Sequence, residues 1–226
     1  MKNIIITLLL SCVFALDDIS IEIITTNDLH GNIAPQKAWF MNPGFPPDIS
    51  GGAALLKYVE ESKALSNSEI LIFDAGNFFQ GHPYGMNDGG IKMIEWMNQL
   101  GYSALVPGEN DFVLGQENLN QLANNANFPF LMSNLICDDC NLTSDNIKPY
   151  IIKEINGIKI GILGFIDTEL TDKALSDNIK GISIVGIKDG YSAKNSKHVI
   201  VISPKNKKLL TPISESYQSI IWHLIV

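Results

Sequence analysis

Apolar, often β-branched runs alternate along the chain with segments whose apolar residues recur every three or four positions. The short runs predict strands, and the periodic segments predict helices. Strands are expected over residues 19–26, 70–74, 104–106, 130–133, 151–155 and 159–164, and helices over 53–66, 90–100 and 116–126. This alternation predicts an α/β fold, a layered β-sheet core with flanking helices outside.

Two irregular stretches add to this picture. Asn156-Gly157, between two apolar runs, is typical of a type I′ hairpin and predicts an antiparallel edge or a second sheet layer. Residues 32–50 hold four of the ten prolines and predict a long ordered loop. Its Trp39, Phe40 and Phe45 could form a lid over a cleft. We expect them to pack and anchor the loop instead.

The first residues are typical of an export signal. Residues 1–15 carry one positive charge, an apolar core and a Val13-x-Ala15 step, which predicts a signal peptide cleaved near Ala15. Lipid attachment at Cys12 is the alternative. No apolar stretch approaches the about 20 residues of a transmembrane span. We therefore expect an exported protein, periplasmic or extracellular, either free or lipid-anchored.

Charge and cysteine content narrow the function. The formal net charge is −8 and no Arg occurs, which disfavours nucleic-acid binding and removes the usual bidentate phosphate clamp. Apolar residues make up 46% of the chain, enough for one substantial core. Cys137 and Cys140 predict a local disulfide or two idle thiols, because no second C-x-x-C completes a zinc site.

The best clue to function is Asp28-Leu29-His30, at the end of the first apolar run. Side chains at i and i+2 of a strand share a face, so Asp28 and His30 could converge on one cation. A carboxylate with an imidazole suits Zn, Mn or Fe better than Ca. In isolation the same pattern is more often a solvated Asp beside an ordinary loop histidine. The context must therefore decide.

That context consists of five blocks in order. They read IEIITTNDLHG (21–31), GGAALLKYVEES (51–62), ILIFDAGNFFQG (70–81), GYSALVPGENDFVLG (101–115) and YIIKEINGIKIGILG (150–164), with NFPFLMSN (127–134) between the last two. With these blocks the chain resembles the 5′-nucleotidase family of calcineurin-like metallophosphoesterases, from about residue 19 to 165. The resemblance implies hydrolysis of nucleotide phosphate esters, which are small-molecule substrates.

The resemblance also implies two divalent metal ions, Zn, Mn or similar, that activate a hydroxide for attack on phosphorus. Asp28 and His30 match ligands of the first metal. The metal-bridging carboxylate falls on Asn77, and the metal-binding amide position is Glu109. Two unit charges 4 Å apart interact by about 4 kcal/mol at an effective dielectric near 20. A neutral Asn77 therefore weakens both sites, and only one metal could be retained. Glu109 adds a carboxylate where the family has a neutral amide, so the charge of the site could be partly conserved, with the second metal held differently.

The catalytic positions also depart from the family pattern. Asn110 stands where the family has a histidine that acts as general acid or stabilises the transition state, and loss of such a group removes about 10² to 10⁴ in rate. Asp111 keeps the acidic character of the next position. His82 could be a substitute metal ligand or contact a substrate phosphate, although a solvent-facing loop histidine is the plainer interpretation.

We therefore expect a metallophosphoesterase-like domain over residues 19–180 with weak metal-dependent hydrolysis, or a pseudoenzyme that binds metal or nucleotide without turnover. We expect residues 181–226 to be a divergent or truncated tail, because His198 and His223 lie in no recognisable metal-binding block. A truncated or frame-shifted product and a genuine short homologue are both compatible with this tail. The oligomeric state is not predicted.

Overall fold

A five-stranded parallel sheet underlies the fold. The computed structural model describes residues 20–65, 68–167, 169–184 and 219–222. The strands, in their spatial order, are β1 (Ile21–Thr26), β4 (Glu69–Asp74), β5 (Ala104–Leu105), β6 (Phe130–Leu131) and β8 (Ile147–Lys148). Because these strands are all parallel, the segments that follow them emerge at one edge of the sheet.

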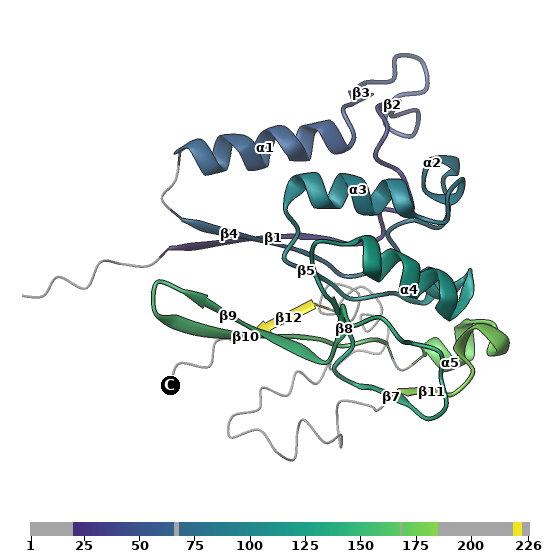
Figure 1. The fold of residues 1–226 in the computed structure, drawn as a ribbon. Coiled ribbons are helices and arrows are strands. Elements are labelled where there is room, and N and C mark those ends of the chain that lie inside the picture. Colours follow the sequence, from purple (N-terminus) through teal and green to yellow (C-terminus); the bar gives the residue numbers. More distant parts are fainter. Residues whose placement is uncertain (1–19, 66–67, 168, 185–218, 223–226) are drawn as a thin grey trace, which may run out of the picture.

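Helices cover one side of this sheet and a second sheet lies on the other (Figure 1). The helices are α1 (Gly52–Leu65), α2 (Pro83–Met86), α3 (Ile91–Leu100), α4 (Gly115–Asn125) and α5 (Leu170–Lys173), with short 3-10 turns η1 (Glu109–Phe112) and η2 (Ser176–Ile179). All three helices predicted from the sequence are confirmed to within one or two residues. The layered α/β architecture is confirmed as well.

The second sheet is antiparallel, with order β12-β10-β9. It consists of β9 (Tyr150–Ile155), β10 (Ile158–Gly164) and β12 (Ser219–Trp222). Asn156 and Gly157 join β9 to β10 with φ angles of 49° and 83°, the left-handed pair that a type I′ turn requires. The predicted hairpin is thus confirmed, as a second layer and not as an edge of the parallel sheet.

The core lies between the parallel sheet and its two coverings. In β4, Leu71, Ile72 and Phe73 are consecutive and all are buried, as expected for a strand covered on both faces. The rings of Phe78 and Phe130 pack edge to face, with centroids 6.3 Å apart. This packing anchors the segment that follows β4, so the sheet edge described below rests on a dense aromatic core.

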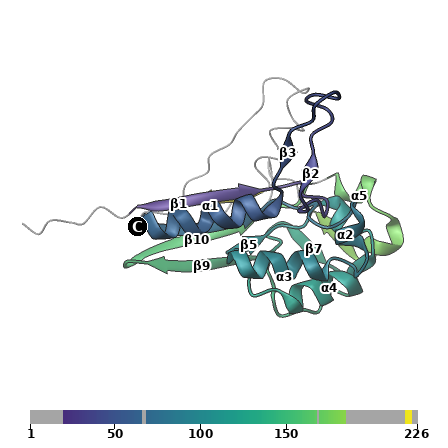
Figure 2. The same cartoon turned by 90° about the horizontal axis from the view of Figure 1, so that it is seen from above.

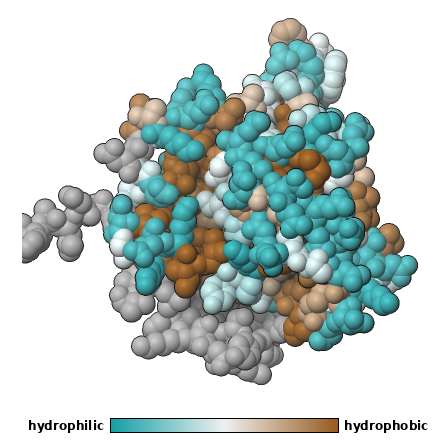
Figure 3. Space-filling view, viewed as in Figure 1, coloured by the Kyte–Doolittle hydropathy of each residue, from teal (hydrophilic) through white to brown (hydrophobic). Residues whose placement is uncertain are grey.

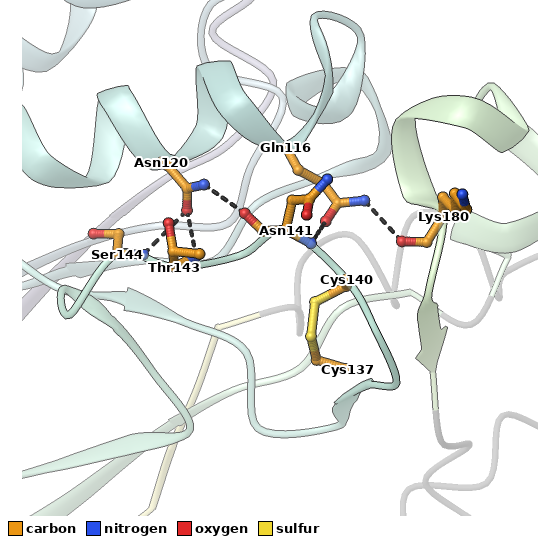
Figure 4. Close-up of a disulfide and its surroundings, with 8 residues drawn as sticks. All are labelled: Gln116, Asn120, Cys137, Cys140, Asn141, Thr143, Ser144 and Lys180. Carbon is orange, nitrogen blue, oxygen red and sulfur yellow. Dashed lines mark hydrogen bonds between the residues drawn. A yellow bond between two sulfur atoms is a disulfide. The ribbon is translucent and has the colours of Figure 1, made fainter.

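Two smaller two-stranded sheets complete the fold. They are β2 (Gln36–Lys37) with β3 (Asp48–Ile49), and β7 (Leu135–Cys137) with β11 (Ile182–Ile184). Cys137 and Cys140 form a disulfide at the end of β7 (Figure 4). This confirms the local disulfide expected from the sequence and makes the idle-thiol alternative wrong.

Side-chain amides of α4 fasten the loop after this disulfide (Figure 4). Asn120 Oδ1 accepts the backbone N–H groups of Thr143 and Ser144, and its Nδ2 donates to the carbonyl of Asn141. Gln116 Oε1 accepts the N–H of Asn141. These bonds satisfy the backbone of a loop that has no strand partner there.

The loop between β1 and α1 differs from the sequence prediction. It is a narrow hairpin that projects away from the sheets (Figure 2). Trp39, Phe40 and Phe45 are 61%, 83% and 82% exposed, so the prediction that they pack as anchors is wrong. The physical reason is that β2 and β3 pair with each other, and this carries the loop beyond the reach of the core.

We predict that Phe40→Ser changes the free energy of unfolding by less than about 0.5 kcal/mol, because an exposed ring loses almost no packing. Phe79→Ala, at a fully buried position of the same residue type, should cost about 3–5 kcal/mol. Chemical denaturation of both variants measures this difference. A cost above about 1 kcal/mol for Phe40→Ser would show that the ring is packed after all.

Candidate functional site

The site forms where the segments after β1 and β4 run side by side. The backbone N–H of Asp28 donates to the carbonyl of Gly76 at 2.9 Å, and that of His30 donates to the carbonyl of Asn77 at 2.9 Å. These bonds continue the parallel pairing of the two strands beyond their ends. They bring two chemically functional segments, about fifty residues apart in the chain, into one place.

Three non-glycine residues of these segments have left-handed backbones. The φ angles are 50° for Asp28, 47° for His30 and 57° for Asn77. This conformation is uncommon outside glycine, and such residues cluster at functional sites where the surrounding structure holds them. It also corrects the sequence argument, because Asp28 and His30 lie beyond the end of β1 and do not share a strand face.

Asp28 and His30 nevertheless converge, with His30 Nε2 3.7 Å from Asp28 Oδ1. His30 Nδ1 lies 2.6 Å from the carbonyl oxygen of Gln80, so the hydrogen-bond geometry assigns the ring proton to Nδ1. Nε2 then turns a lone pair toward the carboxylate. Two acceptors facing each other at this distance are stabilised by a cation between them, and a carbonyl bond to the other ring nitrogen is typical of a metal-binding histidine.

Asn77 is 6% exposed and presents donors to the site. Its Nδ2 donates to Asp28 Oδ1 at 2.9 Å and lies 3.4 Å from Glu109 Oε2. Its Oδ1 accepts the backbone N–H of Asn110 at 3.0 Å. A flipped amide would set its oxygen against both carboxylates and its NH₂ against an N–H, so the network fixes the orientation. Asn77 therefore turns its NH₂ group, which has no lone pair for a metal, toward the two carboxylates.

Asp111 is fully buried, and its two oxygens accept three backbone N–H groups. Oδ2 takes those of Asn77 at 2.7 Å and Gly108 at 2.9 Å, and Oδ1 takes that of Phe78 at 3.0 Å. Burial raises the pKa of Asp111 to about 7, although the three donors oppose the shift. The side chain holds the loop after β4 against η1. This geometry gives Asp111 a positioning role and no open face for a substrate.

Asp74 is a second buried carboxyl, which the sequence motifs did not single out. Its Oδ1 accepts the N–H of Gly76 at 2.8 Å, its Oδ2 accepts the Thr26 hydroxyl at 2.6 Å, and that hydroxyl also lies 2.8 Å from Tyr102 Oη. Desolvation raises the pKa of Asp74 to about 8. The signal for it was present, because Asp74 ends an otherwise apolar strand. Its bonds bind the tips of β1 and β4 together.

Asn110 and His82 border the site. Asn110 is half-buried, with Nδ2 3.5 Å from Glu109 Oε1. The backbone N–H of His82 donates to the carbonyl of His30 at 2.8 Å. His82 Nδ1 caps α2 by accepting the N–H of Tyr84 at 3.2 Å, which leaves Nε2–H free to donate to a ligand.

The chemistry of these groups fits one cation and does not fit a second. Asp28 and His30 offer an oxygen and a nitrogen to a shared ion. Between Asp28 and Glu109 stands an amide nitrogen that cannot ligate. In the part of the chain that the structure describes, no group of three or more His, Cys, Asp or Glu side chains is arranged to hold a metal ion. An ion held between Asp28 and Glu109 would have to displace the Asn77 NH₂ group.

A pocket of about 580 Å³ lies elsewhere, at the amino ends of the strands. Its lining residues include Lys63, Glu69, Ile70, Ile151 and Lys153. Apolar surface also faces solvent between α1 and the β9–β10 hairpin (Figure 3). Because ligands of open parallel sheets bind at the carboxyl ends of strands, we place the functional site at Asp28 and Asn77 and not in this pocket.

Comparison with known proteins shows what the sequence and the fold resemble. A snake venom 5′-nucleotidase from Gloydius brevicauda is 30% identical over 152 residues, which are 66% of this chain and 26% of that protein. The solved structure of a 5′-nucleotidase precursor from Thermus thermophilus superimposes with a TM-score of 0.65 at 22% identity, over 74% of this chain and 32% of that one. No protein-family profile matches the chain.

A calcineurin-like phosphoesterase from Bacillus subtilis has the same fold, with a TM-score of 0.56 at 23% identity over 74% of this chain. The described fold is thus that of a calcineurin-like phosphoesterase. The chain is related to the 5′-nucleotidase family within that class, as its sequence motifs predicted. It spans about a quarter to a third of the length of the relatives it matches.

We predict that Asp74→Asn flattens the dependence of stability on pH. The raised pKa means that folded Asp74 keeps a proton that the unfolded chain releases between about pH 4 and pH 8. Wild-type stability should therefore fall as pH rises through this window, by up to about 1.4 kcal/mol per pH unit. Chemical denaturation at several pH values measures the slope.

The matched control is Asp48→Asn, at a side chain that is 77% exposed and paired with Lys37. This variant should keep the wild-type slope, because surface ion pairs contribute little. Parallel curves for Asp74→Asn and the wild type would contradict the raised pKa.

Proposed function

We propose that this chain is a metallophosphoesterase domain that binds nucleotide phosphate esters at one divalent cation and hydrolyses them weakly. The observation that carries the proposal is the pairing of Asp28 Oδ1 and His30 Nε2 at 3.7 Å, with the histidine tautomer set by Gln80. The relation to 5′-nucleotidases supplies the substrate class. Zn²⁺ and Mn²⁺ suit this pair of ligands.

The proposed chemistry uses few protein groups. When bound, the cation polarises a phosphoryl oxygen as a Lewis acid. Asn110 Nδ2 and His82 Nε2 can each donate a hydrogen bond to the ester, which orients it. Glu109 is only half-buried and lies beside both Asn77 and Asn110.

Proton transfer is the weak step in this proposal. Asn110, at the position that the resemblance assigns to a histidine, exchanges no proton near pH 7. Asp111 is committed to backbone donors. Absence of a general acid lowers the rate by about 10² to 10⁴, so we expect turnover far below that of an enzyme with a complete site.

A pseudoenzyme that binds metal or nucleotide without turnover is the second candidate. The specific observation in its favour is the orientation of Asn77, which turns two N–H groups toward the carboxylates of Asp28 and Glu109. Such an arrangement is satisfied without a bridging ion. Turnover that depends on the cation separates the two candidates.

We also propose that the protein is exported. Residues 1–15 have the pattern of a signal peptide and lie outside the described residues. The Cys137–Cys140 disulfide suits an oxidising compartment. One relative is a snake venom protein. No helix in the described part of the chain is long and apolar enough to cross a membrane.

The tail histidines His198 and His223, which lie in no recognisable metal-binding block, are also outside the described residues.

The test is metal analysis together with a phosphatase assay on nucleoside monophosphates. We predict that the wild type binds one equivalent of Mn²⁺ or Zn²⁺ and shows slow turnover that depends on the metal. His30→Ala should lose both, because only Asp28 remains as a ligand. Removing one protein ligand typically costs at least about 10-fold in metal affinity, as does removing its supporting partner.

His82→Ala serves as the comparison variant. It should keep the metal stoichiometry of the wild type and raise KM for the nucleotide, since its ring donates to the substrate and not to the ion. Full metal binding without turnover would select the pseudoenzyme. Loss of metal from His82→Ala and not from His30→Ala would overturn the assignment of the ligands.

A further inference from the structure

We propose that the side-chain amide of Asn77 takes the place of a second cation and closes the second metal position of this site. The inference deepens the proposed function, because it concerns the same strand tips. The Asn77 NH₂ group contacts the carboxylates of both Asp28 and Glu109, so a cation held by these two residues would have to displace it. A neutral donor group thus reduces the repulsion between the two carboxylates, as a cation would.

The geometry of the NH₂ group supports this substitution. Its two hydrogens have two acceptors, Asp28 Oδ1 at 2.9 Å and Glu109 Oε2 at 3.4 Å. Hydrogen bonds to ionised acceptors are stronger than those between neutral groups. The amide therefore holds two negative groups in one place, where without a donor or a cation they would repel each other.

The amide cannot turn over to expose its oxygen. Asn77 Oδ1 accepts the backbone N–H of Asn110 at 3.0 Å, and the Asn77 backbone N–H is held by Asp111 at 2.7 Å. The side chain is 6% exposed. Rotation of the side-chain amide by half a turn would break its bonds to Asn110, Asp28 and Glu109 and place oxygen against carboxylate, so the donor face is the favoured one when no cation is bound.

The backbone around Asn77 is shaped to keep the amide there. A Cβ added at Gly108 would overlap Asn77 Oδ1 and Cγ, and one at Gly76 would overlap the backbone of Gly108. Two glycines therefore leave the room that the amide occupies. Together with the left-handed φ of 57° at Asn77, this close fit makes the amide part of the packed structure and not a loose side chain.

Two variants of Asn77 test the inference. Asn77→Asp removes the donors and adds a third carboxylate, so it should melt several degrees below the wild type in chelator. About 1 mM Mn²⁺ should restore it. Its affinity for a second Mn²⁺ should exceed that of the wild type by at least about 100-fold. Thermal melting and titration calorimetry measure both effects without any activity assay.

Asn77→Ala separates a closing amide from a merely missing ligand. It removes both donors and adds no ligand atom, so Asp28 and Glu109 face each other without a bridge. If the amide competes with the cation, the rise in melting temperature with Mn²⁺ should be larger in this variant than in the wild type. If Asn77 is only a lost ligand, the two rises should be equal.

The matched control is Asn120→Asp. Asn120 is 7% exposed, close to the value for Asn77, and its Nδ2 also donates to a protein oxygen. Its neighbours are backbone groups of the loop after the disulfide, as Figure 4 shows, and not carboxylates. This variant should lose stability and gain nothing from Mn²⁺.

Two equivalents of Mn²⁺ bound by the wild type would overturn the inference and the single-cation stoichiometry, and would leave metal-dependent hydrolysis as the proposed function. A response of Asn77→Ala equal to that of the wild type would also overturn the inference. Failure of the proposed function has a different signature, since His30→Ala would then match the wild type while Asn77→Asp still gains Mn²⁺ binding. If Asn77→Asp does not fold, the wild-type stoichiometry and Asn77→Ala decide.

Discussion

The pairing of the two chain segments that leave β1 and β4 is the constraint on which the site depends. Three kinds of bond enforce it: the parallel ladder of the strands, the backbone bonds from Asp28 and His30, and the buried Thr26–Asp74 contact between the strand tips. Without this pairing, a carboxylate and an amide from distant parts of the chain would not meet. The aromatic core beneath keeps the segments rigid.

Buried carboxyls have a structural part in this arrangement. Asp74 and Asp111 stand near Asp28 and the half-buried Glu109, yet both are fully buried and accept backbone or hydroxyl donors. Their pKa values are raised by burial, which marks them as costly groups that satisfy the backbone of two tight loops. Of these four acidic residues, Asp74 and Asp111 thus hold the loops, whereas Asp28 and Glu109 border the solvent-facing part of the site.

Asn77 governs the chemistry of the solvent-facing part of the site. An amide nitrogen can bridge two carboxylates by donation, whereas an aspartate at the same place could bridge only through a cation. The fold shared with calcineurin-like phosphoesterases therefore does not determine how many ions the site takes. The donor or acceptor face of one buried side chain determines it, in keeping with the rule that function resides in sites and not in folds.

The layered α/β class, the three long helices and the hairpin at Asn156-Gly157 were predictable from the sequence alone, because hydrophobic period and turn residues are local properties. The resemblance to 5′-nucleotidases grouped Asp28, His30, Asn77 and Glu109, and the structure brings these side chains together. The sequence prediction was wrong for the aromatic residues of the β2–β3 hairpin, which are exposed. It was also wrong on the reason why Asp28 and His30 converge, because both lie beyond the end of β1. Tertiary structure alone decided the exposure of Phe40, the burial of Asp111, the role of Asp74 and the orientation of the Asn77 amide. Each of these depends on which groups meet across the fold, and spacing along a chain does not encode that.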